Sequence, residues 1–116
     1  MSGLPVHAVA PDVFVAAQLA PEDMPVAAHM GFRSVINNRP DFEAGPEQPT
    51  SQRIGAAAHD AGLEYRHLPV APNWQTAADA AALAQLLSEL PRPTLLFCRS
   101  GARSARLHAL ASAGAQ

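Results

Sequence analysis

The segment TLLFCRSGARS, residues 94–104, contains the pattern that decides both the fold and the chemistry of this chain. Residues 94–97 form a short, β-rich apolar run, which predicts a buried strand. Gly101 allows a tight turn and residues 102–113 have strong helical propensity, so a loop and then a helix should follow. Cys98 is therefore expected at the carboxyl end of a strand, just before the N-terminus of a helix.

The rest of the chain alternates short apolar runs with Ala-rich helical stretches. The other predicted strands are residues 13–15, 34–37 and a segment within 63–70, and the other predicted helices are residues 21–30, 50–61 and 76–90. Four strands alternating with four helices predict an α/β fold with a mostly parallel sheet flanked by helices. Ligands of such sheets bind beyond the carboxyl ends of the strands. The loop over residues 38–49 is long for a compact domain, which favours a functional role.

Composition limits the number of domains and the chemistry. A chain of 116 residues suits one domain, residues 1–116, and its 48% hydrophobic and 16% charged residues are typical of a globular protein. The net charge of −2 argues against a nucleic-acid partner. All 8 basic residues are arginines, so the absence of lysine excludes Schiff-base chemistry. The single cysteine excludes an intramolecular disulfide.

We expect neither a cofactor nor a metal. The histidines have no paired ligand spacing, and one cysteine cannot form a multi-cysteine cage. Residues 1–10 lack the basic and apolar regions of a signal peptide, and no apolar run approaches the roughly 20 residues of a membrane-spanning helix. The sequence therefore predicts a soluble, cytoplasmic protein without a membrane partner.

The position of Cys98 predicts a reactive thiol. Free backbone N–H groups and the positive end of the helix dipole lower the pKa of a thiol below its usual value of about 8.5, which favours the nucleophilic thiolate. Arg103 can hold an oxyanion with its planar fork of donors, and Ser104 can donate to the thiolate or cap the helix. We therefore predict Cys98, Arg103 and Ser104 as catalytic residues.

The residues between Cys98 and Arg103 form a predicted anion-binding loop. Gly101 permits the tight turn in which successive backbone amides point inward as an anion nest. The predicted loop residues are Arg99, Ser100, Gly101 and Ala102. An inert, buried cysteine is the competing interpretation, but two arginines beside a buried apolar thiol would be a poor core, which favours function.

Residues 98–104 resemble the active-site loop of rhodaneses and, more loosely, that of cysteine-based protein phosphatases. The wider chain resembles the beta-lactamase hydrolase-like family, whose phosphatase-like domain is also described as a sulfur transferase. The matching stretches are residues 14–19, 31–41, 48–49, 62–65 and 68–70. The resemblance implies an α/β fold like that of dual-specificity phosphatases. Family members usually continue further after the cysteine helix than Gln116, so the resemblance also predicts a domain truncated at its C-terminus.

Two features of the sequence favour sulfur transfer over phosphate hydrolysis. Four residues separate Cys98 from Arg103, which is the rhodanese spacing and one residue fewer than in the phosphatases. Residues 68–75, where such phosphatases usually carry a general acid, contain no carboxylate. We therefore predict a sulfurtransferase that forms a Cys98 persulfide, takes sulfur from a small anionic donor and passes it to an external thiol or sulfite. By resemblance alone, a persulfide-oxidising metallo-hydrolase is a candidate partner.

Two other functions stay open at this stage. A tyrosine or dual-specificity phosphatase could use Cys98 as nucleophile if Asp41 or a neighbouring domain supplied the acid. A non-enzymatic sulfide or redox sensor would accept sulfur on Cys98 without passing it on.

Four residues outside the cysteine loop are candidates for supporting roles. Arg39 could bind an anionic donor or form a salt bridge with Asp41 or Glu43. Asp41 could act as an acid, although a turn or a pairing with Arg39 is favoured, and Gln18 could reach the site, although capping of its own loop is favoured. Trp74 could form a pocket wall or pack under its loop.

Overall fold

A five-stranded sheet with the strand order β1-β2-β5-β3-β4 organises the chain. The computed structural model describes residues 3–114. Its strands are β1 (His7–Ala10), β2 (Val13–Ala16), β3 (Ser34–Asn37), β4 (Glu64–His67) and β5 (Thr94–Phe97). Its helices are the 3-10 turn η1 (Pro21–Asp23) and the α-helices α1 (Met24–His29), α2 (Ser51–Asp60), α3 (Ala77–Glu89) and α4 (Ala102–Gly114). Strands β2 to β5 are mutually parallel, which confirms the predicted α/β class.

The sequence prediction missed β1 and merged η1 with α1. Strand β1 pairs antiparallel with β2 at the edge of the sheet, and its four residues are exposed or only partly buried, so its sequence does not mark a buried strand. The helix predicted over residues 21–30 begins instead as a 3-10 turn, because Met24 N–H donates to the Pro21 carbonyl and Pro25 has no N–H to continue the pattern. The Thr50 cap of α2 and the capping box from Thr76 to Asp79 in α3 form as expected.

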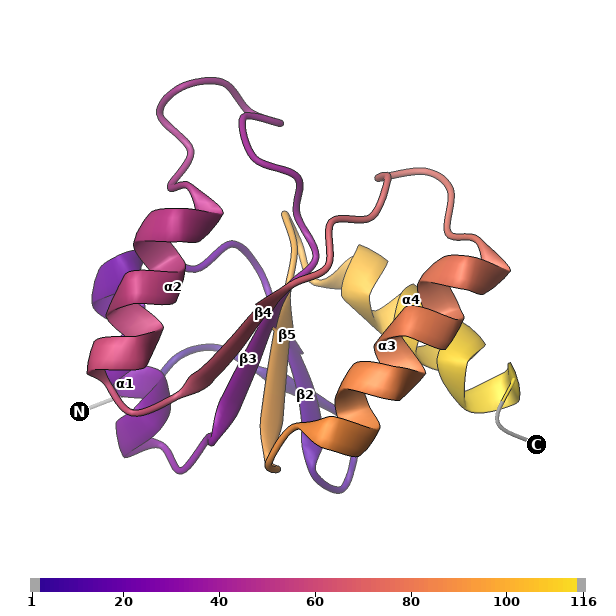
Figure 1. Ribbon diagram of the computed structural model, residues 1–116, viewed down its shortest axis with the longest axis horizontal. Helices are drawn as coiled ribbons and strands as arrows, with labels where there is room; N and C mark the ends of the chain where they lie inside the picture. The colour runs from indigo at the N-terminus through magenta and orange to yellow at the C-terminus, as the bar shows by residue number, and fades with distance from the viewer. Residues whose placement is uncertain (1–2, 115–116) are drawn as a thin grey trace.

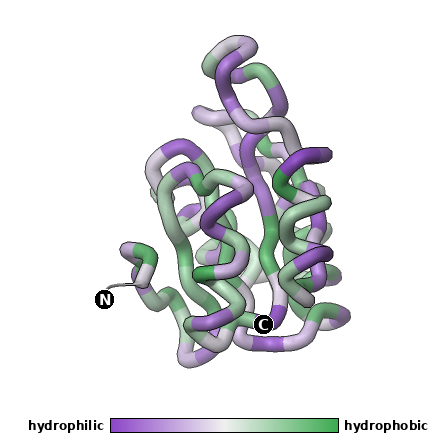
Figure 2. Tube along the Cα trace, turned by 90° about the vertical axis from the view of Figure 1, so that its left-hand side faces the viewer, coloured by the Kyte–Doolittle hydropathy of each residue, from purple (hydrophilic) through white to green (hydrophobic). Residues whose placement is uncertain are grey.

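Helices cover both faces of the sheet (Figure 1). Helices α1 and α2 lie on one face, and α3 and α4 lie on the other. Side chains of β5 alternate between the two cores: Leu95 and Phe97 pack with the core of α1 and α2, while Leu96 packs with that of α3 and α4. Hydrophobic residues follow the strands and the inner sides of the helices (Figure 2). Within residues 3–114, no helix combines the length and apolar character needed to cross a membrane.

The carboxyl ends of the parallel strands are joined at one edge of the sheet. Asn38 N–H donates to the Phe97 carbonyl at 2.8 Å, and Gln18 N–H donates to the Arg99 carbonyl at 3.2 Å. Val70 N–H donates to the Asn38 carbonyl at 3.0 Å, which attaches the segment after β4. Because β3 leads to α2 on one face and β5 leads to α4 on the other, the chain diverges at this edge, where α/β folds bind ligands.

Candidate active site

Cys98 lies at the carboxyl end of β5 and is fully buried. Its Sγ accepts a hydrogen bond from Gly101 N–H at 3.0 Å. Gly101 adopts φ +94°, a conformation that favours glycine, and a Cβ at this position would lie 3.4 Å from the Ala16 carbonyl. The sequence places a glycine where the loop must both turn and approach β2 closely. The predicted tight loop between strand and helix is therefore present.

Opposing effects act on the pKa of the Cys98 thiol. Burial raises this pKa, whereas hydrogen bonds from the backbone and side chain of Ser104 and from the backbones of Gly101 and Ser100 lower it. The hydrogen bonds prevail, so the pKa lies below its ordinary value. This electrostatic arrangement favours a thiolate held by backbone N–H groups.

Arg103 is the buried cation of the site, with a side chain only 5% exposed. Its Nη1 donates to Glu43 Oε2 at 3.1 Å and to the Val70 carbonyl at 3.0 Å, and its Nη2 donates to Glu43 Oε1 at 2.9 Å. Its Nε is buried and is without a hydrogen-bond partner within residues 3–114. A buried donor without a partner is costly, so this N–H is a polar group of residues 3–114 that no acceptor of the chain satisfies.

A second buried arginine shares the same carboxylate. Arg39, 7% exposed at its side chain, donates from Nε to Glu43 Oε1 at 2.9 Å and from Nη1 to Gln18 Oε1 at 3.0 Å. The Glu43 side chain is 20% exposed, although its backbone lies at the surface. Hydrogen bonds from Arg103 hold the pKa of Glu43 below its ordinary value against the effect of burial, and Arg39 adds to them. Glu43 therefore joins the loop after β3 to the cysteine loop.

Ser104 connects the thiol to the end of β3. The Ser104 hydroxyl donates to Asn38 Oδ1 at 2.8 Å, while Asn38 Nδ2 donates to the Leu68 carbonyl at 3.0 Å and so fixes the orientation of the amide. The same hydroxyl is within reach of Cys98 Sγ, whose pKa it lowers. One hydroxyl hydrogen thus has two acceptors, Asn38 Oδ1 and the sulfur, and it can serve only one at a time.

A cavity of about 170 Å³ opens beside the thiol. Its lining consists of Pro72, Cys98, Arg99, Ser100, Ala102, Arg103 and Arg106. This volume is smaller than the roughly 300–1,000 Å³ of drug-sized pockets, and the charged lining residues are all cations. The cavity therefore suits a small anionic group.

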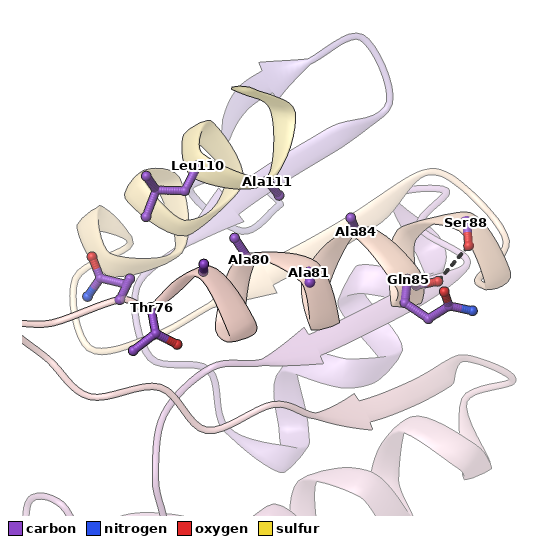
Figure 3. A pocket seen from close by; sticks show the side chains of 10 residues that line it. Thr76, Ala80, Ala81, Ala84, Gln85, Ser88, Leu110 and Ala111 are labelled. Atoms are coloured by element: carbon purple, nitrogen blue, oxygen red, sulfur yellow. Dashed lines mark hydrogen bonds between the residues drawn. The ribbon is translucent and has the colours of Figure 1, made fainter. Parts of the chain in front are cut away.

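A larger groove of about 710 Å³ lies between α3 and α4, away from the thiol (Figure 3). It is lined by small and uncharged residues and contains no titratable side chain. Residues 3–114 also contain no cluster of three His, Cys, Asp or Glu side chains arranged to hold a metal ion. We therefore place the candidate site at Cys98 despite the smaller cavity.

The structure brings most of the predicted residues together and separates one from them. Gln18 and Arg39 join the site through the network described above, and the partner of Arg39 is Glu43. Asp41 instead accepts from Ser51 N–H at 2.8 Å at the start of α2, which supports its structural interpretation as a turn residue, without the Arg39 pairing. Trp74 is 71% exposed and is not among the residues that line the cavity beside Cys98, so the structure shows neither of its two alternatives, a pocket wall or packing under its loop.

Glu43 and Asn38 are the two residues whose importance the sequence prediction missed. The sequence predicted Glu43 only as a possible salt-bridge partner of Arg39, because nothing in the sequence reveals that residues 43 and 103 are in contact. Asn38 entered only as part of a family stretch. A polar residue directly after a buried strand is a signal that could have indicated Asn38, since strand carboxyl ends meet at the ligand-binding edge.

Replacing Glu43 with glutamine should destabilise the domain by about 1–3 kcal/mol, because two buried guanidinium groups lose their shared counter-charge. The lowered pKa of Glu43 means that this stabilisation is present above the ordinary carboxyl pKa and is lost as the pH falls through the lowered value. Urea unfolding at pH 7 and at acidic pH measures both effects.

A matched control is Glu64→Gln, which breaks the exposed pair of Glu64 with Arg66 at 3.6 Å. This change should cost less than about 1 kcal/mol. Equal unfolding free energies for the two variants would contradict the stabilising role of Glu43 as the shared counter-charge of two buried arginines.

The chain has an α/β phosphatase-like fold, with a cysteine loop between the central strand and a helix. Residues 5–115 match the family described as "Beta-lactamase hydrolase-like protein, phosphatase-like domain". The chain belongs to this family, which confirms the resemblance found in the sequence.

Two curated relatives carry the family name. The Beta-lactamase hydrolase-like protein of Agrobacterium fabrum is 36% identical over 99 residues, which cover 85% of this chain and 23% of the relative. That of Xylella fastidiosa is 41% identical over 83 residues, which cover 72% of this chain and 19% of the relative. The chain thus spans about a fifth of the length of the curated relatives it matches.

Solved structures support the same class. A "putative phosphatase" from Neisseria meningitidis superposes with a TM-score of 0.79 at 29% identity, covering 86% of this chain and 70% of that one. A "putative phosphatase" from Shewanella putrefaciens gives a TM-score of 0.80 at 19% identity, with coverage of 98% and 73%. TpbA from Pseudomonas aeruginosa, solved with phosphotyrosine, has a TM-score of 0.63 at 15% identity, with coverage of 90% and 59%. The last two matches establish the shared fold alone.

The prediction of a rhodanese-like sulfurtransferase with a Cys98 persulfide is wrong. The family is phosphatase-like, and the structural relatives are described as phosphatases. The spacing argument fails for a physical reason: the loop from Cys98 to Arg103, though one residue shorter, still directs Gly101 N–H at the sulfur and buries Arg103 beside it with a free Nε. Loop length alone does not separate the two chemistries.

Proposed function

We propose that this domain hydrolyses phosphate monoesters, with Cys98 as the nucleophile. The thiolate is favoured by the hydrogen bonds around it, and the adjacent cavity is small and cationic. Arg99 and Arg106 at the exposed part of the lining would attract a dianionic phosphoryl group by long-range electrostatics.

The observation that carries this proposal is the unpartnered Nε of Arg103. Every other nitrogen of this guanidinium donates to Glu43 or to the Val70 carbonyl, so the side chain is held in one orientation. The remaining N–H is buried and belongs to a residue that lines the cavity beside Cys98. A phosphoryl oxygen would satisfy this donor and bring the phosphorus close to the thiolate.

The proposed reaction has two steps. The Cys98 thiolate attacks phosphorus, an S–P bond forms, the P–O bond to the leaving group breaks, and the leaving oxygen keeps the electron pair. Water then attacks phosphorus, the S–P bond breaks, the thiolate is restored, and phosphate and a proton are released. Backbone N–H groups of residues 99–103 and the Arg103 guanidinium would stabilise the charge on the phosphoryl oxygens in both steps.

Steady-state hydrolysis of p-nitrophenyl phosphate tests the proposal. We expect repeated turnover that inorganic phosphate inhibits competitively, since both anions would occupy the same cavity. Hydrolysis no faster than that of a Cys98→Ala variant would refute the proposal, and so would release of a single equivalent of p-nitrophenol without further turnover.

Replacing Ser104 with alanine should raise the pKa of Cys98, because the hydroxyl is one of the donors that lower it. Alkylation of the thiol by iodoacetamide should therefore follow a pH profile displaced to higher pH, and kcat should fall by roughly 10- to 100-fold, as expected for one hydrogen bond to a charged group. The measurements are the alkylation rate and the hydrolysis rate as functions of pH.

Ser112→Ala is the matched control, because Ser112 is an exposed serine of the same helix. It should change neither profile. An alkylation profile of Ser104→Ala identical to that of the unaltered protein would show that the hydroxyl does not act on the sulfur.

A further inference from the structure

Asn38 is a buried polar residue to which the proposed reaction assigns no role. It directly follows β3, and its side chain is fully buried, as are those of Ser104 and Cys98. Burying an amide is unfavourable unless all of its hydrogen bonds are made. The contacts that Asn38 makes therefore indicate what it contributes at the ligand-binding edge of the sheet.

Both backbone groups and both side-chain groups of Asn38 are hydrogen-bonded. Its N–H donates to the Phe97 carbonyl at 2.8 Å, and its carbonyl accepts from Val70 N–H at 3.0 Å. Its Nδ2 donates to the Leu68 carbonyl at 3.0 Å, and its Oδ1 accepts from the Ser104 hydroxyl at 2.8 Å. Since the Leu68 carbonyl can only accept, the amide cannot be reversed, and its oxygen must face Ser104.

The Ser104 hydroxyl has a single hydrogen to donate. Asn38 Oδ1 is an acceptor only, and an ionised Cys98 sulfur is also an acceptor only. Because all three side chains are fully buried, bulk water cannot supply a second donor to this group. The hydrogen bond that Ser104 makes to Asn38 is therefore one that it withholds from the sulfur.

Building on the proposed phosphoryl transfer, we infer that Asn38 is a positioning residue whose side-chain oxygen holds the Ser104 hydroxyl hydrogen away from the Cys98 sulfur before the thiolate attacks. The hydrogen stays covalently bound to Ser104 Oγ throughout, and only its acceptor differs. A more basic thiolate is a stronger nucleophile, and a thiolate that accepts fewer hydrogen bonds is more basic. Asn38 thereby favours formation of the S–P bond, while it lowers the fraction of the thiol that is ionised.

The charged groups around the thiol do not depend on Asn38. Glu43 accepts from two buried arginines, and the end of β2, which packs against the loop at Ala16, adds no charge. The side-chain partners of Asn38 are uncharged groups, the Leu68 carbonyl and the Ser104 hydroxyl. An uncharged replacement of Asn38 thus leaves the charges in place, so a change in the titration of the thiol reports the hydroxyl. The cations that line the cavity beside the thiol are Arg99, Arg103 and Arg106.

Alkylation of Cys98 by iodoacetamide as a function of pH tests the inference with Asn38→Leu, which has a similar volume and no polar atom. The released hydroxyl should donate to the sulfur, so the profile should move to lower pH. Below its midpoint the rate should rise about 10-fold, the lower end of the effect of one hydrogen bond to a charged group. Above its midpoint the rate should fall about threefold, because the ionised sulfur is less basic.

The two profiles should therefore cross, which a merely loosened loop would not produce. Formation of the S–P bond with p-nitrophenyl phosphate, measured by rapid quench above the midpoint, should also be slower in Asn38→Leu. The double variant Asn38→Leu/Ser104→Ala should have the same alkylation profile as Ser104→Ala, because no hydroxyl remains to be redirected.

Asn37→Leu is the matched control. Asn37 is also a buried asparagine, 2% exposed, but its side chain bonds to the Tyr65 hydroxyl and to Arg39 N–H and not to Ser104. This variant should leave the alkylation profile unchanged below and above its midpoint.

Asn38→Asp provides a second test that keeps the shape and the acceptor if the leucine variant does not fold. Its carboxylate should hold the hydroxyl more strongly and repel the thiolate, so the profile should move to higher pH. The displacement should be larger with Ser104 present than in the Ser104→Ala background, where the repulsion acts alone.

Four results would overturn the inference. For Asn38→Leu they are a profile that coincides with that of the unaltered protein, a displacement to higher pH, and a displacement that persists without Ser104. For Asn38→Asp it is an equal displacement in both backgrounds. Alkylation requires no hydrolysis, so these results are distinct from failure of the proposed function, which would abolish turnover of p-nitrophenyl phosphate by the unaltered protein.

Discussion

Replacing Cys98 with serine is expected to lower kcat for p-nitrophenyl phosphate by at least about 10³-fold, because a serine hydroxyl stays protonated at neutral pH and is a weak nucleophile without a base beside it. The substitution removes little volume from a fully buried position, and the serine oxygen can accept from Gly101 N–H as the sulfur does. The variant should therefore keep its fold and its affinity for inorganic phosphate. Hydrolysis rates, thermal unfolding and calorimetric titration with phosphate measure these three properties.

Since Cys98 is the only cysteine of the sequence, no other thiol can replace it in this experiment. A Cys98→Ser variant that folds and retains more than about a tenth of the activity, a loss of only ~1.4 kcal/mol in transition-state stabilisation, would exclude the thiolate as nucleophile.

Replacing Arg103 with lysine is expected to lower kcat/KM by about 10²- to 10³-fold, which is the typical loss of one donor to a transition-state oxyanion. Lysine keeps the positive charge but has no Nε donor at the same place, and it cannot hold both oxygens of Glu43 and the Val70 carbonyl in a planar fork. This variant therefore tests the geometry of the hydrogen-bond donors at position 103, because the positive charge of the side chain is kept.

Arg66→Lys is the matched control, because Arg66 is an exposed residue of β4 and its ion pair with Glu64 is open to solvent. It should alter kcat/KM by less than about fivefold, the limit for an exposed ion pair. If both arginine variants behaved alike, Arg103 would act through charge alone, and the orientation of its Nε would be irrelevant.

Local sequence signals predicted the helices and the parallel strands because each has its own pattern. Residues 94–97 are an apolar run before a glycine-containing loop, which predicts a buried strand. Thr76 and Asp79 have the three-residue spacing of a capping box, which predicts the start of α3. The edge strand β1 escaped prediction because it is only partly buried and depends on its pairing with β2. Residues 21–30 divide into η1 and α1 because Pro25 lacks the backbone N–H that would continue the hydrogen-bond pattern. The spacing of apolar residues does not reveal this detail.

The cysteine loop was predictable because its residues are consecutive, whereas the contact of Glu43 with Arg103 was not. Glu43 and Arg103 are 60 positions apart, and their contact depends on the path of the loop after β3. The absence of a carboxylate from residues 68–75 favoured sulfur transfer in the sequence, but the match to a phosphatase-like family contradicts that interpretation.

The most direct test of the central claim is to identify the phosphorylated residue during turnover. Mixing the protein with p-nitrophenyl phosphate, quenching in acid within the first turnover and analysing the peptides by mass spectrometry should reveal one phosphoryl group on the peptide containing Cys98. The same treatment of Cys98→Ser should give no labelled peptide. Release of p-nitrophenol with the phosphoryl group on another residue, or with none on Cys98 at any quench time, would contradict the account.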